Sequence, residues 1–294
     1  MCILDFAKLP DSWRETNISL IPKEDLDHKQ IRNYRSISLL NADYKIFATI
    51  MSERLKIILN ELIHSDQNSF LPARQLRNNT RIVLNVLEYY EAHPEKQAAL
   101  IFLDAQKAFD NLSWQFLIQQ VEIMGFGSKF KKMIGAIYSN QKSRIIINGE
   151  TTENFRIMKG VRQGCPMSPL LFILTMEVLL NQIRQRKEII GLKSKKEEYK
   201  VQAFADDLVF FLEDPMESGT YLIQELEEYG IVAGLKINKD KTKVITKNLT
   251  ENKKKDLERK WGLQNAKKLK YLGIWLTGRC SSIKEDNYMK LLTQ

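Results

Sequence analysis

Phe204-Ala205-Asp206-Asp207 lies between two short apolar runs, Val201–Phe204 and Leu208–Leu212. Two apolar runs separated by a polar pair are typical of a β-hairpin, so we expect both carboxylates at its tip. An Asp-Asp pair alone is most often a solvated turn, because Asp hydrogen-bonds its own backbone and tolerates turn geometry. A third carboxylate, Asp104, changes this interpretation. It ends the apolar run Ala98–Leu103, which has the pattern of a strand buried on both faces.

Carboxylates at the ends of adjacent strands would repel one another, and the pKa of at least one would rise unless cations neutralised them. Mg²⁺, or Mn²⁺ in its place, takes oxygen ligands and binds through carboxylates plus substrate phosphates. Two such ions roughly 3.5–4 Å apart activate an attacking hydroxyl and stabilise the leaving oxygen in phosphoryl transfer. Asp104, Asp206 and Asp207 therefore predict a two-metal nucleotidyltransferase.

Length and composition indicate a globular intracellular protein. The 294 residues are 44% hydrophobic, enough for one large domain or two lobes. We expect no transmembrane helix, because no run of about eighteen uncharged apolar residues occurs. The start, Met1–Asp5, lacks the basic flank and apolar centre of a signal peptide. The three cysteines have no paired spacing, which argues against a disulfide framework or a zinc site.

The net charge of +9 is concentrated in one segment. Between Lys236 and Lys270 there are thirteen Lys and Arg and four Asp and Glu, a surplus of nine, so the rest of the chain balances to zero. Such a segment favours a polyanionic partner. The alternative is a solvated, Lys-rich face, and the charge alone does not decide between the two.

The remaining patterns predict a mixture of helices and strands. Helical spacing of apolar residues is found over 41–63, 82–90, 114–124, 130–138, 170–183 and 218–233, and a Lys-rich helix is expected over 251–260. Further strands are expected at 18–22, 144–149, 155–158, 243–246 and 270–275, with Asn148-Gly149 as a hairpin turn. This order indicates an α+β fold with helices behind a mainly antiparallel sheet.

Two loops stand out. Residues 66–81 are polar and contain Arg74, Arg77 and Arg81, which is compatible either with a path along a nucleic-acid backbone or with an ordinary basic loop. Residues 159–169 hold two glycines and two prolines, so we expect a shaped loop. The helix after it is apolar almost all round, which predicts that it is buried and supports the loop rigidly.

Six motifs that follow one another along the chain carry a resemblance to a known family. The chain resembles the reverse transcriptase domain of non-LTR, LINE-type retrotransposons over about Pro10 to Trp275. The motifs are Leu-Ile-Pro-Lys (20–23), Tyr-Arg-x-Ile-Ser-Leu-Leu-Asn (34–41), Leu-Asp-Ala-x-Lys-Ala-Phe-Asp (103–110), Arg-Gln-Gly-Cys-Pro-x-Ser-Pro-Leu-Leu-Phe (162–172), Phe-Ala-Asp-Asp (204–207) and Lys-Tyr-Leu-Gly-Ile (270–274).

The resemblance implies a right-hand polymerase with fingers and palm. Residues 1–97 would form the fingers and the N-terminal part of the domain. Residues 98–294 would form the palm, with a fingers insertion and a primer-grip turn at Tyr271-Leu272-Gly273, and would end before a thumb. The implied reaction is RNA-directed DNA synthesis, in which a primer 3′-OH attacks a dNTP α-phosphate on an RNA template. Without a thumb, we expect weak activity.

The resemblance also implies roles for single residues. Asp104 and Asp206 would provide most of the metal ligation, with Asp207 the weaker ligand. Lys241, or its neighbour Lys239, would protonate the leaving pyrophosphate.

Other matched residues would bind the nucleotide. Lys23 and Arg35 would hold the triphosphate, and Gln163 and Gly164 would pack on the incoming nucleotide and template. Phe109 would exclude a ribose 2′-OH and so select deoxynucleotides.

The sequence departs from the family pattern at several positions. Ser69 stands where the family usually has Gly, and Ser36 where it usually has Pro. No departure removes a predicted metal ligand. Two alternatives remain at this point: a catalytically inert nucleic-acid-binding protein derived from a retrotransposon, and a group II intron-type or other cellular reverse transcriptase. The second usually carries Tyr-Ala-Asp-Asp at the hairpin tip, and this chain has Phe204.

Overall fold

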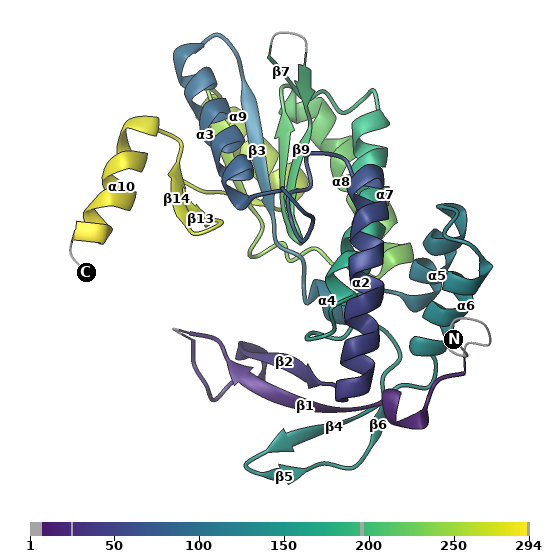
Figure 1. Ribbon diagram of the computed structural model, residues 1–294. Coiled ribbons are helices and arrows are strands. Elements are labelled where there is room, and N and C mark those ends of the chain that lie inside the picture. Colours follow the sequence, from purple (N-terminus) through teal and green to yellow (C-terminus); the bar gives the residue numbers. More distant parts are fainter. Residues whose placement is uncertain (1–7, 25, 195–196, 293–294) are drawn as a thin grey trace. The chain divides into compact units, whose positions relative to one another are not determined.

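The computed structural model describes residues 8–24, 26–194 and 197–292 (Figure 1). Residues Met1–Asp5, which carry the expectation about a signal peptide, lie outside the described residues. The chain divides into two compact units, each assembled from separate stretches. Unit 1 contains residues 1–62, 107–175 and 232–234, and unit 2 contains residues 63–106, 176–231 and 235–294.

Unit 1 is built on a mixed sheet. Strand β1 (Glu15–Pro22) pairs antiparallel with β2 (Tyr34–Leu39) and parallel with β4 (Lys142–Ile147). β4 also pairs antiparallel with β5 (Glu150–Thr151) and β6 (Phe155–Arg156).

The turn between β4 and β5 confirms the predicted Asn-Gly hairpin. Asn148 and Gly149 have φ values of 51° and 87°, as a two-residue hairpin turn with two left-handed residues requires. The helices of unit 1 are α2 (Ala42–Leu62), α4 (Ala108–Asn111), α5 (Trp114–Ile123), α6 (Ser128–Ile137) and the first part of α7 (Ser168–Gln185), with 3-10 turns η1 (Asp11–Trp13) and η2 (Ile31–Asn33).

Helix α7 is buried almost all round, as its apolar sequence predicts. Leu171, Leu174 and Leu180 are fully inaccessible to solvent. The loop at 159–167 therefore leads into a helix that is fixed by packing on several sides.

Unit 2 is built on a sheet with the strand order β12-β11-β3-β10-β9. The antiparallel strands are β11 (Lys243–Lys247), β3 (Ala98–Leu103), β10 (Asp207–Leu212) and β9 (Val201–Phe204), and β12 (Gln264–Asn265) adds a parallel edge to β11. Every residue of β3 is buried, which confirms the prediction of a strand buried on both faces. The α+β class and the mainly antiparallel sheet with β3 at its centre are thus present.

One face of this sheet is covered by helix α3 (Leu76–Ala92) and by the hairpin of β13 (Lys268–Tyr271) and β14 (Ile274–Thr277). Their core residues pack against alternate residues of the sheet strands, which point to the same face. The core contains Val83, Leu87, Tyr90, Leu100, Phe102, Val209, Phe211, Ile245, Leu269, Tyr271 and Leu276. The other elements of unit 2 are β7 (Leu192–Ser194), β8 (Glu197–Tyr199), α8 (Pro215–Ala233), α9 (Glu251–Trp261) and α10 (Cys280–Leu292).

Two predictions about local structure are wrong. The single strand expected at 270–275 is a hairpin, because Leu272 and Gly273 adopt φ values of 44° and 89° and reverse the chain. Helix α3 begins at Leu76, six residues before its predicted start. Its first turns lack apolar periodicity because the residue buried there is polar, the fully inaccessible Asn79.

None of the helices in the described parts of the chain combines the length and the apolar character that a membrane span needs.

Candidate active site

The strand register of unit 2 brings the three predicted aspartates to one end of its sheet. In the antiparallel pair of β3 and β10, Leu103 lies opposite Leu208. The next position along this register is Asp104 opposite Asp207. β9 and β10 are joined by the two-residue turn Ala205-Asp206, with Phe204 paired to Asp207. The predicted hairpin is therefore present, with Asp206 in its turn and Asp207 as the first residue of β10.

A second segment holds Asp104 from the other side. The Asp104 N–H donates to Thr242 Oγ1 at 3.1 Å, and the Asp104 carbonyl accepts from the Asn238 N–H at 2.9 Å. The Gln106 N–H donates to the Lys236 carbonyl at 2.8 Å, so residues 236–238 run antiparallel to 104–106. Asp104 is thus fixed by its backbone on both sides.

This contact also places the turn that contains the predicted lysines. The Lys241 and Thr242 N–H groups donate to the Asn238 carbonyl at 3.2 and 2.8 Å. Lys241 is exposed and makes no ion pair with any described residue. Lys239 lies 3.8 Å from a carboxylate oxygen of Glu227, so its charge already has a partner. Of the two lysines, Lys241 is the one with a free ammonium group in the described structure.

The pKa values of Asp206 and Asp207 are both raised. Loss of solvation is the main cause of the raised pKa of Asp206, and the negative charge of Asp104 adds to it. Asp207 keeps contact with solvent, yet desolvation together with the charges of Asp206 and Asp104 raises its pKa to about 6. The cluster is therefore electrostatically unfavourable when fully ionised, and a cation bound there would relieve the repulsion.

The donor set fits a hard divalent cation, since such ions prefer carboxylate oxygens. In the described residues, no three His, Cys, Asp or Glu side chains are already arranged to hold a metal ion. The backbone positions of Asp104, Asp206 and Asp207 are close, and their side chains would have to turn toward a common centre to share one.

The residues predicted to contact the nucleotide all belong to unit 1. Arg35 is exposed on β2, and Ile21, two residues before Lys23, is its pairing partner on β1. The loop before α7 reaches the same sheet, because the Gln163 carbonyl accepts from the Ser38 N–H at 2.8 Å. A Cβ at Gly164, whose φ is 109°, would lie 2.8 Å from the Ser38 carbonyl oxygen, so this close approach requires glycine.

Phe109 connects to the same loop through α4. Its carbonyl accepts from the Val161 N–H at 2.7 Å. The Phe109 ring stacks on the buried Phe172 ring with 4.5 Å between centroids and 16° between planes. The ring is half-buried and its orientation is fixed by this stacking.

Sequence reasoning missed several polar residues near these sites. In unit 1, Asp110 is half-buried, and desolvation raises its pKa while the charges of Lys107 and Lys23 oppose the rise. In unit 2, the buried side chains of Gln67 and Ser69 contact the Ala205 peptide. The one available signal for the second pair was the polar Ser69 at a position where the family usually has Gly.

The chain is similar to known proteins over most of its length. A family model described as "Reverse transcriptase (RNA-dependent DNA polymerase)" matches residues 21–276. The Transposon TX1 uncharacterized 149 kDa protein of Xenopus laevis is 31% identical over 292 residues, which are 97% of this chain and 22% of that protein. The Pol polyprotein from the type-2 retrotransposable element R2DM of Drosophila melanogaster is 33% identical over 241 residues, 81% of this chain and 22% of that protein. The chain thus spans about a fifth of the length of these relatives.

Solved structures show the fold in other proteins. The structure of apo telomerase from Candida tropicalis, truncated from the C-terminal domain, is similar with a TM-score of 0.58 at 13% identity, over 92% of this chain and 54% of that one. Telomerase from Candida albicans is similar with a TM-score of 0.56, also at 13% identity, over 92% of this chain and 46% of that one. The family match covers most of the chain, and relatives include the mobile element jockey polymerase of Drosophila melanogaster. The chain belongs to the reverse transcriptase family, as a reverse transcriptase domain related to the polymerases of non-LTR retrotransposons.

Proposed function

We propose that this domain is an RNA-directed DNA polymerase whose metal site is formed by Asp104, Asp206 and Asp207. The observation that carries the proposal is the register of β3 and β10, which pairs Leu103 with Leu208, the residues directly next to Asp104 and Asp207. Family membership supports the reaction type. The likeness to telomerase structures supports the fold. Within it, residues 1–97 would form the fingers and the N-terminal part of the domain, and residues 98–294 the palm with a fingers insertion.

Asp104 and Asp206 would be the principal ligands, and Asp207 the weaker one. Two bound Mg²⁺ ions, or Mn²⁺ ions, would lower the pKa of the primer 3′-OH and neutralise charge on the phosphates. The chain's own contribution is to fix the three carboxylates on adjacent strands before substrate arrives, which avoids reorganisation during the reaction.

The nucleotide would be held by unit 1. Lys23 and Arg35 supply positive charge for the triphosphate, and the Gln163-Gly164 loop supplies a closely packed surface for the base pair. Phe109 would block a ribose 2′-OH, and the stacking of its ring on Phe172 supports this role because a fixed ring cannot move aside. In unit 2, the free ammonium group of Lys241 would donate a proton to the leaving pyrophosphate.

Primer extension tests the proposal. Purified protein, Mg²⁺, dNTPs and a DNA primer annealed to an RNA template should give extended primers, and Asp206→Ala should reduce the rate by at least about a thousandfold. Arg259→Ala is a suitable control, because the Arg259 side chain is 81% exposed and has no proposed role in the site. Equal rates for wild type and Asp206→Ala would contradict the proposal.

A second candidate function is nucleic-acid binding without catalysis. The basic segment 236–270 favours it, since Lys255, Lys267 and Lys270 are exposed and their charges are available to a phosphate backbone. Not every charge of the segment is available, because Lys247 is buried and its Nζ forms an ion pair with Glu91 Oε2 at 3.2 Å. If wild type and Asp206→Ala are equally inert but bind RNA with a steep salt dependence, this second function is correct.

A further inference from the structure

The turn that carries Asp206 adopts a backbone conformation that needs support. Ala205 has a φ of 57°, in the left-handed region. A residue with a Cβ adopts this conformation at a cost of about 1–2 kcal/mol, so the surrounding structure must hold it. Ala205 lies in the two-residue turn between the paired positions Phe204 and Asp207, and it is buried away from water that could serve as its hydrogen-bond partner.

Two buried side chains from a distant segment supply that support. The Ala205 N–H is shared by Gln67 Oε1 at 3.1 Å and Ser69 Oγ at 2.9 Å. The Ser69 hydroxyl donates to Gln67 Oε1 at 2.8 Å, and the Gln67 amide nitrogen lies 3.5 Å from the Ala205 carbonyl oxygen. Gln67 is fully inaccessible and Ser69 is 1% exposed. We call Gln67 and Ser69 together the turn clamp.

The segment that carries the turn clamp is itself joined to β9. The Ala203 N–H donates to the Asp66 carbonyl at 2.9 Å, and the Asn68 N–H donates to the Ala203 carbonyl at 2.9 Å. Gln67 and Ala203 form a parallel bridge. Residues 66–68 thus continue the sheet beyond its edge strand, and the clamp is held in register with the turn.

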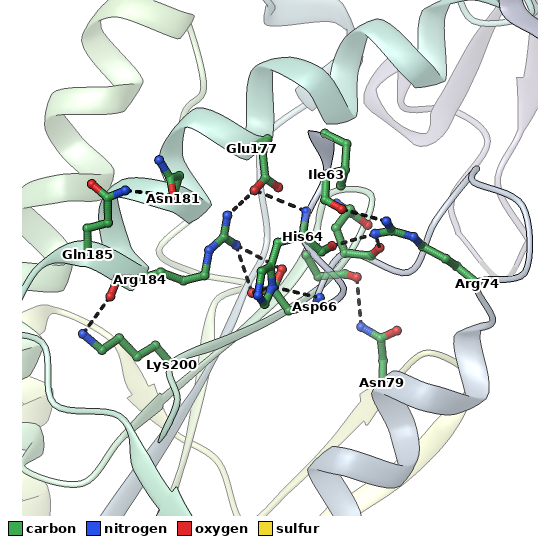
Figure 2. A network of polar contacts seen from close by, with 12 residues as sticks. Ile63, His64, Asp66, Arg74, Asn79, Glu177, Asn181, Arg184, Gln185 and Lys200 are labelled. Carbon is green, nitrogen blue, oxygen red and sulfur yellow. Dashed lines mark hydrogen bonds and ion pairs between the residues drawn. The ribbon is translucent and has the colours of Figure 1, made fainter. Parts of the chain in front are cut away.

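A polar network anchors the segment from behind (Figure 2). Both Asp66 carboxylate oxygens accept from Arg184, at 3.0 and 2.9 Å, and Arg184 also contacts Glu177. The Arg74 guanidinium donates to the carbonyls of Ile63, His64 and Gln67 at 2.6–2.7 Å. Figure 2 shows Glu177 and Arg184 from α7, and Arg74 from the loop before α3, converging around residues 63–66. The Arg74 guanidinium therefore holds the backbone of residues 63–67.

We propose that Gln67 and Ser69 are positioning residues for the metal site. By fixing the Ala205 peptide, they set the positions from which Asp206 and Asp207 present their carboxylates to a divalent cation. This inference rests on the proposed function of the three aspartates. Ser69 adds a hydroxyl acceptor that glycine at this position lacks, so this chain's turn is held by two acceptors and not by Gln67 alone.

Two variants and one control test the turn clamp. Ser69→Gly removes the hydroxyl, and Gln67→Met removes both amide contacts while keeping a similar volume. Gln202→Met is the matched control, because Gln202 is also buried, lies on β9, and its Oε1 makes no hydrogen bond within the described structure. The full chain is used throughout. Each variant is first shown to unfold in the same transition as the wild type.

The first readout does not depend on catalysis. Hydrogen exchange of the metal-free protein, measured on peptides that cover 203–208, should show a protected Ala205 amide in wild type. Exchange there should be about tenfold faster or more in Ser69→Gly and Gln67→Met, and unchanged in Gln202→Met. Mn²⁺ affinity, measured by water proton relaxation, should fall by about 10–100-fold in Gln67→Met and less in Ser69→Gly.

Primer extension supplies the second readout. The Mg²⁺ concentration for half-maximal rate should rise in both clamp variants, while the KM for dNTP stays within about twofold of wild type. Unchanged exchange and unchanged Mn²⁺ affinity in both clamp variants would overturn the inference. Wild-type protein that extends no primer would instead reject the proposed function, and the exchange and Mn²⁺ data would still decide on the clamp.

Discussion

Removing the Arg184 guanidinium should destabilise unit 2 strongly. The Arg184 side chain is 17% exposed, and its partners Asp66 and Glu177 are 8% and 10% exposed. Arg184→Met keeps the apolar stem but leaves the nearly buried Glu177 without its ion-pair partner, and leaves Asp66 with His64, 3.1 Å away, as its remaining partner. Loss of one partner from a buried ion pair costs about 3–5 kcal/mol. Since a domain of this kind is stable by about 5–15 kcal/mol, the loss is a large fraction of the total.

The loss should depend on pH with a definite sign. Desolvation raises the pKa of Glu177, and the charge of Arg184 opposes the rise. Without Arg184 the folded-state pKa rises further above the unfolded value. A carboxyl with a raised folded pKa binds more protons in the folded state, so stability decreases as pH rises through that pKa. The difference between Arg184→Met and wild type should therefore be largest at pH 7.5 and smaller at pH 5.

Urea unfolding followed by tryptophan fluorescence measures both effects. The midpoint should fall with little change in m-value, because the same surface is exposed on unfolding. Arg259→Met is the control, since Arg259 and its partner Asp256 have side-chain exposures of 81% and 51%, and its loss should cost less than about 0.5 kcal/mol. An Arg184→Met variant within 1 kcal/mol of wild type, or with the same deficit at both pH values, would refute this reasoning.

Further predictions concern packing and acid stability. A Cβ at Gly219 would lie 2.0 Å from a ring carbon of the buried Trp261, so Gly219→Ala should destabilise by about 1–3 kcal/mol despite the better helix propensity of Ala. In α6, a Cβ at Gly135 would meet its nearest atom at 3.9 Å, and Gly135→Ala should stabilise by up to about 1 kcal/mol in thermal unfolding. Hydrogen bonds from Cys280 and the nearby Lys247 lower the pKa of Glu91 to about 2. Glu91→Gln should therefore lower the free energy of unfolding by about 1–2 kcal/mol above pH 4.5, after allowance for the exposure of Glu91. The difference from wild type should disappear as pH falls toward 2. A difference that stays constant over that range would show that the charge of Glu91 is not its cause.

The placement of the three aspartates at strand ends in unit 2 was predictable because its signals are local. Each aspartate directly follows or interrupts an apolar run, and a buried strand fixes where the next residue must lie. Antiparallel pairing then brings the end of β3 next to the start of β10. To predict this, it is enough to know that these two strands are neighbours in the sheet. The predicted residues of unit 1 came from the family resemblance, because single cations such as Lys23 and Arg35 have no local signal.

The turn clamp was not predictable for the opposite reason. Ser69 and Ala205 are 136 residues apart, and the residues between them give no pattern that pairs them. Polar residues in a loop are typical of a solvated surface, whereas Gln67 and Ser69 are buried by tertiary contacts. The local pattern also gave no sign of the hairpin at Leu272-Gly273, because leucine seldom adopts a positive φ and the alternation of Lys270 to Trp275 is compatible with one strand. The turn at this position was expected from the family resemblance alone.

The central claim is that residues 104 and 205–207 surround one divalent cation. Fe²⁺ can replace Mg²⁺ at sites with oxygen ligands, and in the presence of ascorbate and peroxide it cleaves the peptide chain locally. The prediction is cleavage near Asp104 and near the Ala205–Asp207 turn in the same sample, competed by excess Mg²⁺ and lost from both places in Asp206→Asn. Cleavage at only one of the two segments, or cleavage that persists in Asp206→Asn, would contradict the claim.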